Sequence, residues 1–127
     1  MRSLTLAGLG LLAVAGSASA GPADVNAQAF YVDARELLDK GMRAMFDKRT
    51  KPRMAQLKAA GQLAKSENEA ATAKGRPIYC VSDDERKKGL DAERAVKMLG
   101  AVPEADRRRM TLAQAWRAAL IREYPCR

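Results

Sequence analysis

The sequence contains no histidine, and this absence excludes several classes of active site. Ser-His-Asp and Cys-His nucleophilic centres, histidine zinc sites and haem bound through a proximal histidine all require an imidazole ring. Catalysis by lysine or by carboxylates alone survives this exclusion, but no two carboxylates have a spacing that suggests a shared site. We therefore predict a protein that is not an enzyme and that needs no cofactor and no metal ion.

Aromatic residues make up only 5% of the chain, and none lies between Phe46 and Tyr79. Basic residues are concentrated in that interval, so the sequence offers no aromatic platform on which nucleic-acid bases could stack. Phosphate-binding glycine loops, EF-hand loops, internal repeats and alternating strand-length runs are also absent. A chain of 127 residues is long enough for one domain. These observations predict a single all-α domain that does not bind nucleic acid.

Long apolar runs are confined to the amino terminus. Arg2 precedes an apolar stretch over residues 4–15, and the small residues Ala18-Ser19-Ala20 follow it. The stretch is too short to span a membrane, which takes about 20 apolar residues, and it has the three regions of a secretory signal peptide. We predict that residues 1–20 are removed, that the protein is periplasmic, and that the remaining domain, residues 21–127, has no transmembrane segment.

The chain has only two cysteines, Cys80 and Cys126, which can pair in one way. An oxidising periplasm favours a disulfide between them, and closing a loop of this length contributes about 4 kcal/mol in the chain-entropy description. A redox centre would require a Cys-x-x-Cys pair or a perturbed thiol, and the sequence shows neither. We therefore predict a structural disulfide.

Apolar spacing predicts two helices in the first half of the domain. The first, from about Val25 to Phe46 with Asp24 as its cap, has apolar residues at intervals of three and four. The second runs from about Pro52 to Lys74 and has a thin apolar face, so we expect much of it to be exposed or to meet a partner. The apolar residues of the first helix are Val25, Ala29, Val32, Leu37, Leu38, Met42, Met45 and Phe46, and the large ones of the second are Met54, Leu57 and Leu63.

Capping residues place the helices of the second half. Ser82 and Asp91 are both good caps, and we favour the later start, which gives a helix over 92–99. Thr111 and Gln114 form a capping-box pattern that opens the last helix, in which Trp116 is predicted to be the core anchor of an apolar stripe. The predicted fold is all-α, a small helical bundle of about four helices with one disulfide. The full stripe is Leu112, Ala115, Trp116, Ala119 and Leu120.

Positive charge is concentrated between residues 40 and 65, where Asp47 is the one acidic residue. Two interpretations stay open: a contact surface for an acidic protein, anionic lipid head groups or a polyanion, or a solvated face that keeps the protein soluble. The run Arg107 to Arg109 is interpreted as flexible exposed charge. The candidate interaction surface consists of Lys48, Arg49, Lys51, Arg53 and Lys58.

The second half resembles the Rap1a/Tai family. The resemblance rests on Gly75-Arg76-Pro77-Ile78-Tyr79-Cys80, on an alanine-rich last helix, and on the ending Tyr124-Pro125-Cys126, with Val96, Leu99, Val102-Pro103 and Arg107 to Arg109 between them. Members of that family are small exported helical proteins, and the best-known ones are immunity proteins that inhibit cell-wall amidase toxins delivered by type VI secretion. The resemblance implies that Cys80 and Cys126 are the family's disulfide pair, and it is compatible with a homodimer.

The leading hypothesis is therefore a periplasmic, non-enzymatic Rap1a/Tai-like domain that binds another protein. A cell-wall amidase effector is the partner that the resemblance suggests, and inhibition would be steric. Two alternatives stay open. One is a periplasmic chaperone that exposes apolar surface under acid stress. The other is a basic protein that binds polyanions of the cell envelope.

Overall fold

The computed structural model describes residues 21–127, and the predicted signal peptide lies outside the described residues. Every regular element of this part of the chain is a helix, and four of them, α1, α2, α4 and α6, have nine or more residues. The predicted all-α fold of about four helices is therefore confirmed. The elements are η1 (Pro22–Asp24), α1 (Ala27–Lys40), η2 (Gly41–Phe46), α2 (Thr50–Ala73), α3 (Asp83–Lys88), α4 (Ala92–Gly100), α5 (Glu104–Arg107) and α6 (Leu112–Glu123).

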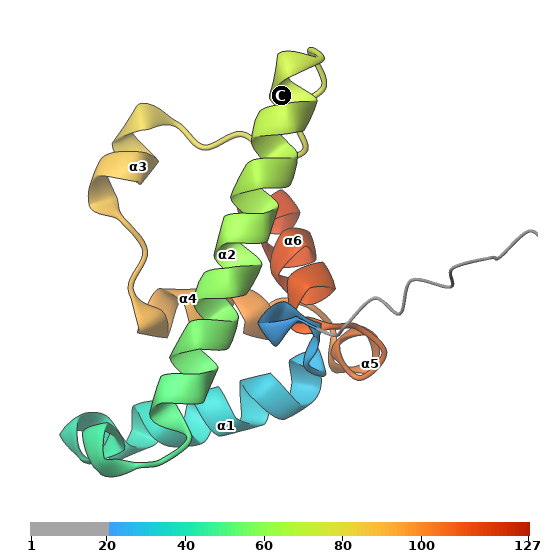
Figure 1. Ribbon diagram of the computed structural model, residues 1–127. Helices are drawn as coiled ribbons and strands as arrows, with labels where there is room; N and C mark the ends of the chain where they lie inside the picture. Colours follow the sequence, from blue (N-terminus) through green and yellow to red (C-terminus); the bar gives the residue numbers. More distant parts are fainter. Residues whose placement is uncertain (1–20) are drawn as a thin grey trace, which may run out of the picture.

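The long helix α2 runs the height of the domain in Figure 1, and α1 crosses it near its amino-terminal end. Helix α2 packs against α6, and α1 contacts both α4 and α6, so these four helices enclose the core. Helix α3 stands apart from α2 and has no buried residue. The 3-10 helix η2 forms the corner of the domain between α1 and α2, at the lower left of Figure 1.

Helix α2 meets the core through small residues. Its buried positions are Ala60 and Ala64, and Trp116 of α6 is buried in the same cluster. A Cβ atom at Gly61 would lie 3.9 Å from the indole nitrogen of Trp116, so α2 passes close to this ring. Of the larger apolar side chains of α2, Leu57 is partly buried against the core, whereas Met54 is 67% exposed and Leu63 is 44% exposed. The thin apolar face of this helix is thus a surface for close helix packing.

The predicted first helix is shorter in the structure than in the sequence analysis. Asn26, not Asp24, caps α1, because its Oδ1 accepts a hydrogen bond of 3.0 Å from the Ala29 N–H. The helix ends at Lys40 because Gly41 adopts a φ of +58°, which L side chains rarely adopt. Residues 41–46 continue as η2, so the apolar positions beyond Lys40 no longer share the buried face of α1.

In the second half of the domain, the helices begin at the capping residues that the sequence contains. Asp91 caps α4 through a bond of 2.8 Å from the Arg94 N–H. The predicted later start is thus confirmed, and Ser82 in addition caps a short helix, α3, that the sequence analysis did not include. Gly89, at a φ of +69°, separates these two helices. The capping box at Thr111 and Gln114 opens α6 as predicted, and the five apolar residues of the predicted stripe are all buried.

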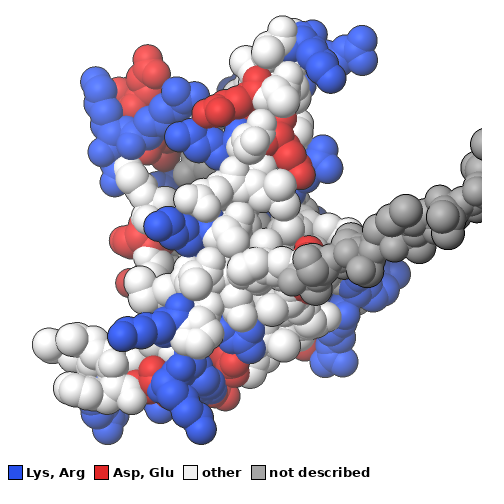
Figure 2. Space-filling view, in the orientation of Figure 1, with Lys and Arg blue, Asp and Glu red and all other residues white. Residues whose placement is uncertain are grey.

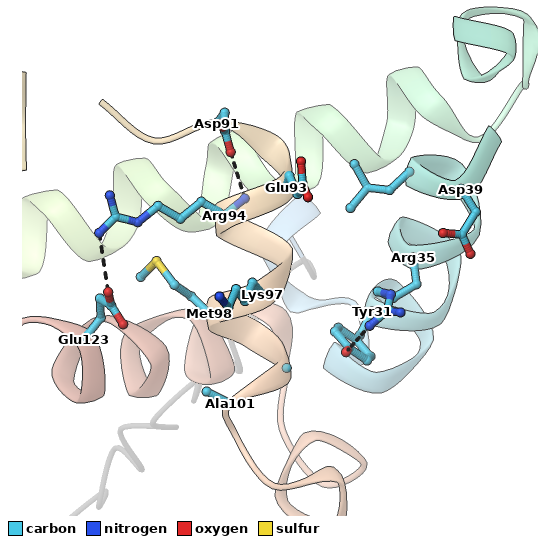
Figure 3. Close-up of a pocket in the computed structure, with 12 residues that line it drawn as sticks. Tyr31, Arg35, Asp39, Asp91, Glu93, Arg94, Lys97, Met98, Ala101 and Glu123 are labelled. Carbon is cyan, nitrogen blue, oxygen red and sulfur yellow. Dashed lines mark hydrogen bonds and ion pairs between the residues drawn. The ribbon is translucent and has the colours of Figure 1, made fainter. Parts of the chain in front are cut away.

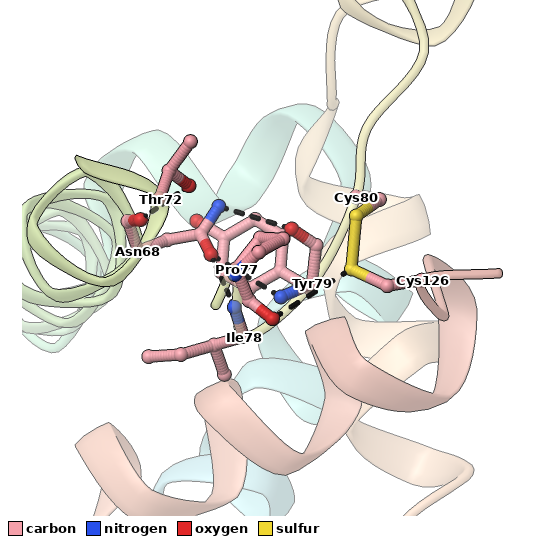
Figure 4. Close-up of a disulfide and its surroundings, with 7 residues drawn as sticks. All are labelled: Asn68, Thr72, Pro77, Ile78, Tyr79, Cys80 and Cys126. Atoms are coloured by element: carbon pink, nitrogen blue, oxygen red, sulfur yellow. Dashed lines mark hydrogen bonds between the residues drawn. A yellow bond between two sulfur atoms is a disulfide. The ribbon is translucent and has the colours of Figure 1, made fainter. Parts of the chain in front are cut away.

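The predicted disulfide joins Cys80 to Cys126, with Cα atoms 4.9 Å apart (Figure 4). The Cys80 N–H donates to the Tyr124 carbonyl at 2.8 Å, so backbone and sulfur bonds fasten the same two segments. The side chain of Asn68 on α2 holds the preceding residues: its Oδ1 accepts from the Ile78 and Tyr79 N–H groups, and its Nδ2 donates to the Tyr79 carbonyl. The segment 78–80 is thereby bound both to the carboxyl-terminal part of α2 and to the residues that follow α6.

Candidate interaction surface

Two of the five residues of the predicted basic surface form ion pairs within the fold. Arg49 donates to Asp33 at 3.1 Å and to Glu36 at 2.7 Å, and Arg53 donates to Asp33 at 2.7 Å. The guanidinium carbon of Arg53 also lies 5.8 Å from the centre of the Phe30 ring. These contacts connect the start of α2 to α1, so Arg49 and Arg53 hold the two helices together.

The turn between η2 and α2 is organised around Asp47. Its carboxylate accepts from Lys40 at 2.6 Å and from the backbone nitrogen and two side-chain nitrogens of Arg49, and its side chain is only 8% exposed. Hydrogen bonds from Arg49 and Lys40 hold the pKa of the Asp47 carboxyl well below its usual range. The hydrogen bonds to Asp47 and Glu36 raise the pKa of Arg49. The one acidic residue of this turn is therefore covered and fully paired.

The other three predicted residues, Lys48, Lys51 and Lys58, are exposed, and so is Arg43 on η2. Within residues 21–127, no carboxylate lies within ion-pair distance of any of the four. We call these four residues the basic collar. Figure 2 shows Lys and Arg side chains at this end of the domain. The structure thus divides the predicted surface into an internal ion-pair cluster and a set of exposed cations.

The basic collar lies beside three exposed apolar side chains of η2, which we call the η2 tip. Met42 is 83% exposed, Met45 is 73% exposed and Phe46 is 89% exposed. Figure 2 shows a largely uncharged surface at the lower-left corner of the domain, where η2 lies. Clustered apolar exposure of this kind is typical of a surface that binds a protein or a membrane. The sequence analysis counted these residues among the apolar positions of the first helix, although Gly41 within that series was a signal of the break.

An apolar groove of about 240 Å³ lies behind the η2 tip, between α1, α2 and α4. Gly41 and Ala44 of η2 form one end of it, and the exposed side chain of Met54 forms part of its edge. Its walls are almost wholly apolar. They comprise Phe30, Ala34, Leu37, Leu38, Gly41, Ala44, Thr50, Arg53, Met54, Leu57, Ala92 and Val96.

A second hollow, of about 1040 Å³, lies on the other side of α4 (Figure 3). Its lining is rich in charged residues of both signs, among them Arg35, Asp39 and Lys97. Arg94 in this lining donates to Glu85 at 3.1 Å and to Glu123 at 3.4 Å. The hydrogen bond from Arg94 lowers the pKa of Glu85, because the nearby cation stabilises the charged form of that acid. Within residues 21–127, no group of three or more Cys, Asp or Glu residues could hold a metal ion.

Arg107 is not the flexible exposed residue that the sequence analysis predicted. It is 6% exposed, and it donates to the Gln28 side chain at 2.8 Å and to the carbonyls of Gly100 and Val102. Its neighbours Arg108 and Arg109 are exposed and pair with nearby acids of α5, as expected for surface charge. Three adjacent arginines look alike in sequence, and only the fold distinguishes them.

Comparison of the chain with protein-family models, curated proteins and solved structures finds no match. The resemblance to the Rap1a/Tai family therefore continues to rest on the residues of the second half alone. Within the described residues, no helix has both the length and the apolar character that crossing a bilayer requires.

Proposed function

We propose that this chain is an exported, non-enzymatic domain that binds another protein. The observation that carries the proposal is the apolar groove between α1, α2 and α4, together with the exposed side chain of Met54 at its edge. Apolar cavities of about 150 Å³ already admit a benzene ring. A groove of about 240 Å³ therefore has room for an apolar side chain of a partner.

The two carboxylates with shifted pKa values, Asp47 and Glu85, are unsuited to acid–base catalysis. The pKa values of Asp47 and Glu85 are both lowered by hydrogen bonds from arginines, so neither acid retains a proton for donation near neutral pH. A general acid needs a pKa close to the working pH, and a general base needs free oxygens. In both residues the oxygens are instead occupied by cationic side chains.

The specific partner we propose is a peptidoglycan amidase, with the domain acting as its immunity protein. The resemblance over residues 75–127 suggests this class, and the disulfide suits a periplasmic location, where such toxins act. Inhibition would be steric, because a bound domain would cover the substrate cleft of the enzyme. A second copy of the chain is the alternative occupant of the groove, and sedimentation velocity of the protein alone tests for it.

The proposal is tested with a secreted amidase encoded next to this chain. We expect the purified domain to inhibit peptidoglycan hydrolysis and to form a stoichiometric complex with the enzyme. Met54→Glu places a charge at the edge of the groove and should weaken inhibition at least about tenfold. Leu63→Glu on the same helix, outside the groove, is the matched control and should inhibit normally. Full amidase activity at saturating domain would refute the immunity function.

A chaperone that opens in acid is a second candidate function, because ion pairs join the two helices of the α1–α2 hairpin. Asp33 of α1 pairs with Arg49 and Arg53, and Asp47 of the connecting turn pairs with Arg49. The lowered pKa of Asp47 keeps its carboxylate charged at pH values where ordinary aspartates are already protonated. Because the unfolded chain takes up its proton first as the pH falls, the stabilisation that Asp47 gives to this hairpin declines in acid.

A further inference from the structure

We propose that the η2 tip inserts into the surface of an anionic phospholipid bilayer while the basic collar binds the lipid head groups. This inference concerns a different surface from the groove and goes beyond the proposed protein binding. It assigns a function to the most exposed apolar side chains of residues 21–127, which the fold itself does not use.

The shape and composition of the η2 tip fit a bilayer interface. Met42, Met45 and Phe46 lie within one short 3-10 segment at a corner of the domain (Figures 1 and 2). Each is more than 70% exposed, so the side chains project from the surface instead of lining a depression. Interfacial membrane anchors combine a few such apolar side chains with neighbouring lysine and arginine.

The charge pattern distinguishes a lipid surface from a protein partner. Residues 41–58 contain one acidic residue, Asp47, and its side chain is 8% exposed and paired with Lys40 and Arg49. The surface around the η2 tip therefore presents the cations of the basic collar, and the exposed acids of the adjoining end of α1 are Asp39 and Glu36, of which Glu36 pairs with Arg49. Ordinary protein surfaces intersperse charges of both signs, whereas an anionic bilayer offers charge of one sign over its whole area. Charge complementarity thus favours the lipid surface.

The backbone that carries the η2 tip is held in place before any contact forms. The Thr50 hydroxyl donates to the Ala44 carbonyl at 2.5 Å, and Asp47 Oδ1 accepts from the Arg49 N–H at 2.9 Å. Lys40 joins the end of α1 to the same aspartate. A preorganised anchor loses little conformational entropy when it inserts, so the contacts it makes contribute to affinity.

Vesicle binding tests the proposal directly. The protein is expressed for export, purified from the periplasm, and checked by mass spectrometry to begin at Gly21, so that the apolar leader does not contribute. It should sediment with phosphatidylcholine vesicles that contain phosphatidylglycerol and not with vesicles of phosphatidylcholine alone. Binding should weaken as salt is added, because salt screens the basic collar. Soluble glycerol phosphate should not compete, since it offers no apolar layer.

Substitutions separate the two parts of the surface. Phe46→Ser should reduce the partition coefficient at least about tenfold, because it removes the burial of one aromatic side chain. Each of Lys48→Gln and Lys51→Gln should reduce it about fivefold on anionic vesicles. The matched controls are Ile121→Ser, an exposed apolar residue of α6, and Lys65→Gln, a basic residue of α2 outside the collar. Both controls should bind like the unsubstituted protein.

A fluorescent variant gives a readout that does not depend on loss of binding. Phe46→Trp adds a second indole to a protein whose own Trp116 is buried in the core. Its emission should shift to shorter wavelength with anionic vesicles and stay unchanged with neutral ones. The proposal is wrong if this emission does not respond to anionic vesicles, or if Phe46→Ser binds them normally. If the emission of Phe46→Trp shifts with the amidase but not with anionic vesicles, the η2 tip is a protein contact and the membrane proposal is wrong. Because Phe46→Ser should impair vesicle binding and leave amidase inhibition intact, the two proposals can fail separately.

Discussion

Arg107 lies against the ring of Tyr31, with its guanidinium carbon 4.1 Å from the ring centre. The two residues come from α5 and α1, and the carbonyls that Arg107 reaches belong to the end of α4. Those carbonyls have no partner within their own helix and lie at the negative end of its dipole. A buried cation without a carboxylate is thus stabilised by backbone oxygens and an aromatic face.

We predict that Arg107→Leu destabilises the domain by about 2–4 kcal/mol, because the carbonyls of Gly100 and Val102 would lose their donor. Arg107→Lys keeps the positive charge but not the planar guanidinium group with its several N–H donors. We therefore expect a smaller loss of stability than for Arg107→Leu. Urea unfolding followed by circular dichroism measures both. Arg109→Leu, on an exposed neighbour, is the control and should change stability little. Equal stability of the Arg107 and Arg109 variants would contradict the structural role of Arg107.

Gly100 gives a second prediction at the same junction. A Cβ atom at this position would lie 2.7 Å from the Tyr31 hydroxyl and 3.3 Å from two ring carbons. Gly100→Ala should therefore destabilise the domain by about 1–3 kcal/mol, as overpacking usually does. Tyr31→Phe removes the closest of these atoms, so the double variant should lose less stability than the two single effects added together. A double-mutant cycle in urea measures this coupling, and strict additivity would mean that the two residues do not meet.

The sequence predicted the elements whose signals are local. The capping box at Thr111, the buried stripe with Trp116 and the pairing of Cys80 with Cys126 were all correct, because each depends on neighbouring residues or on the only available partner. The extent of the first helix was wrong, since periodicity continues through Gly41 although the backbone turns there. The spacing of apolar residues predicts which face of a helix is buried, but it does not show where the helix ends and the backbone changes direction.

The candidate surface was only partly predictable for a related reason. Arg49 and Arg53 belong to the same basic run as Lys51, and nothing in the run shows that Asp33 lies opposite two of the three. That acid is sixteen residues before Arg49 and twenty before Arg53, so the contact depends on how α1 and α2 cross. The η2 tip was hidden similarly, because its side chains continue the apolar series of α1 and only the tertiary fold exposes them.

The pH dependence of stability provides a third prediction, based on Asp47. Its pKa is lower in the folded protein than in the unfolded chain, so its ion pairs stabilise the fold fully at pH values above the ordinary aspartate pKa of about 3.9. As the pH falls below that value the unfolded chain takes up a proton first, and the stabilisation declines toward the lower folded pKa. Asp47→Asn should therefore lower stability at neutral pH and flatten the decline in acid.

Glu85→Gln offers the matched comparison for this experiment. Hydrogen bonds from Arg94 lower the pKa of Glu85 in the same direction, but this pair lies between α3 and α4, away from the α1–α2 hairpin. Thermal unfolding from pH 2 to 7 should show a flatter acid decline for both variants, while only Asp47→Asn should also loosen the turn that carries the η2 tip. Amide hydrogen exchange of residues 41–50 measures that loosening. Unchanged exchange there in Asp47→Asn would show that Asp47 does not hold the turn.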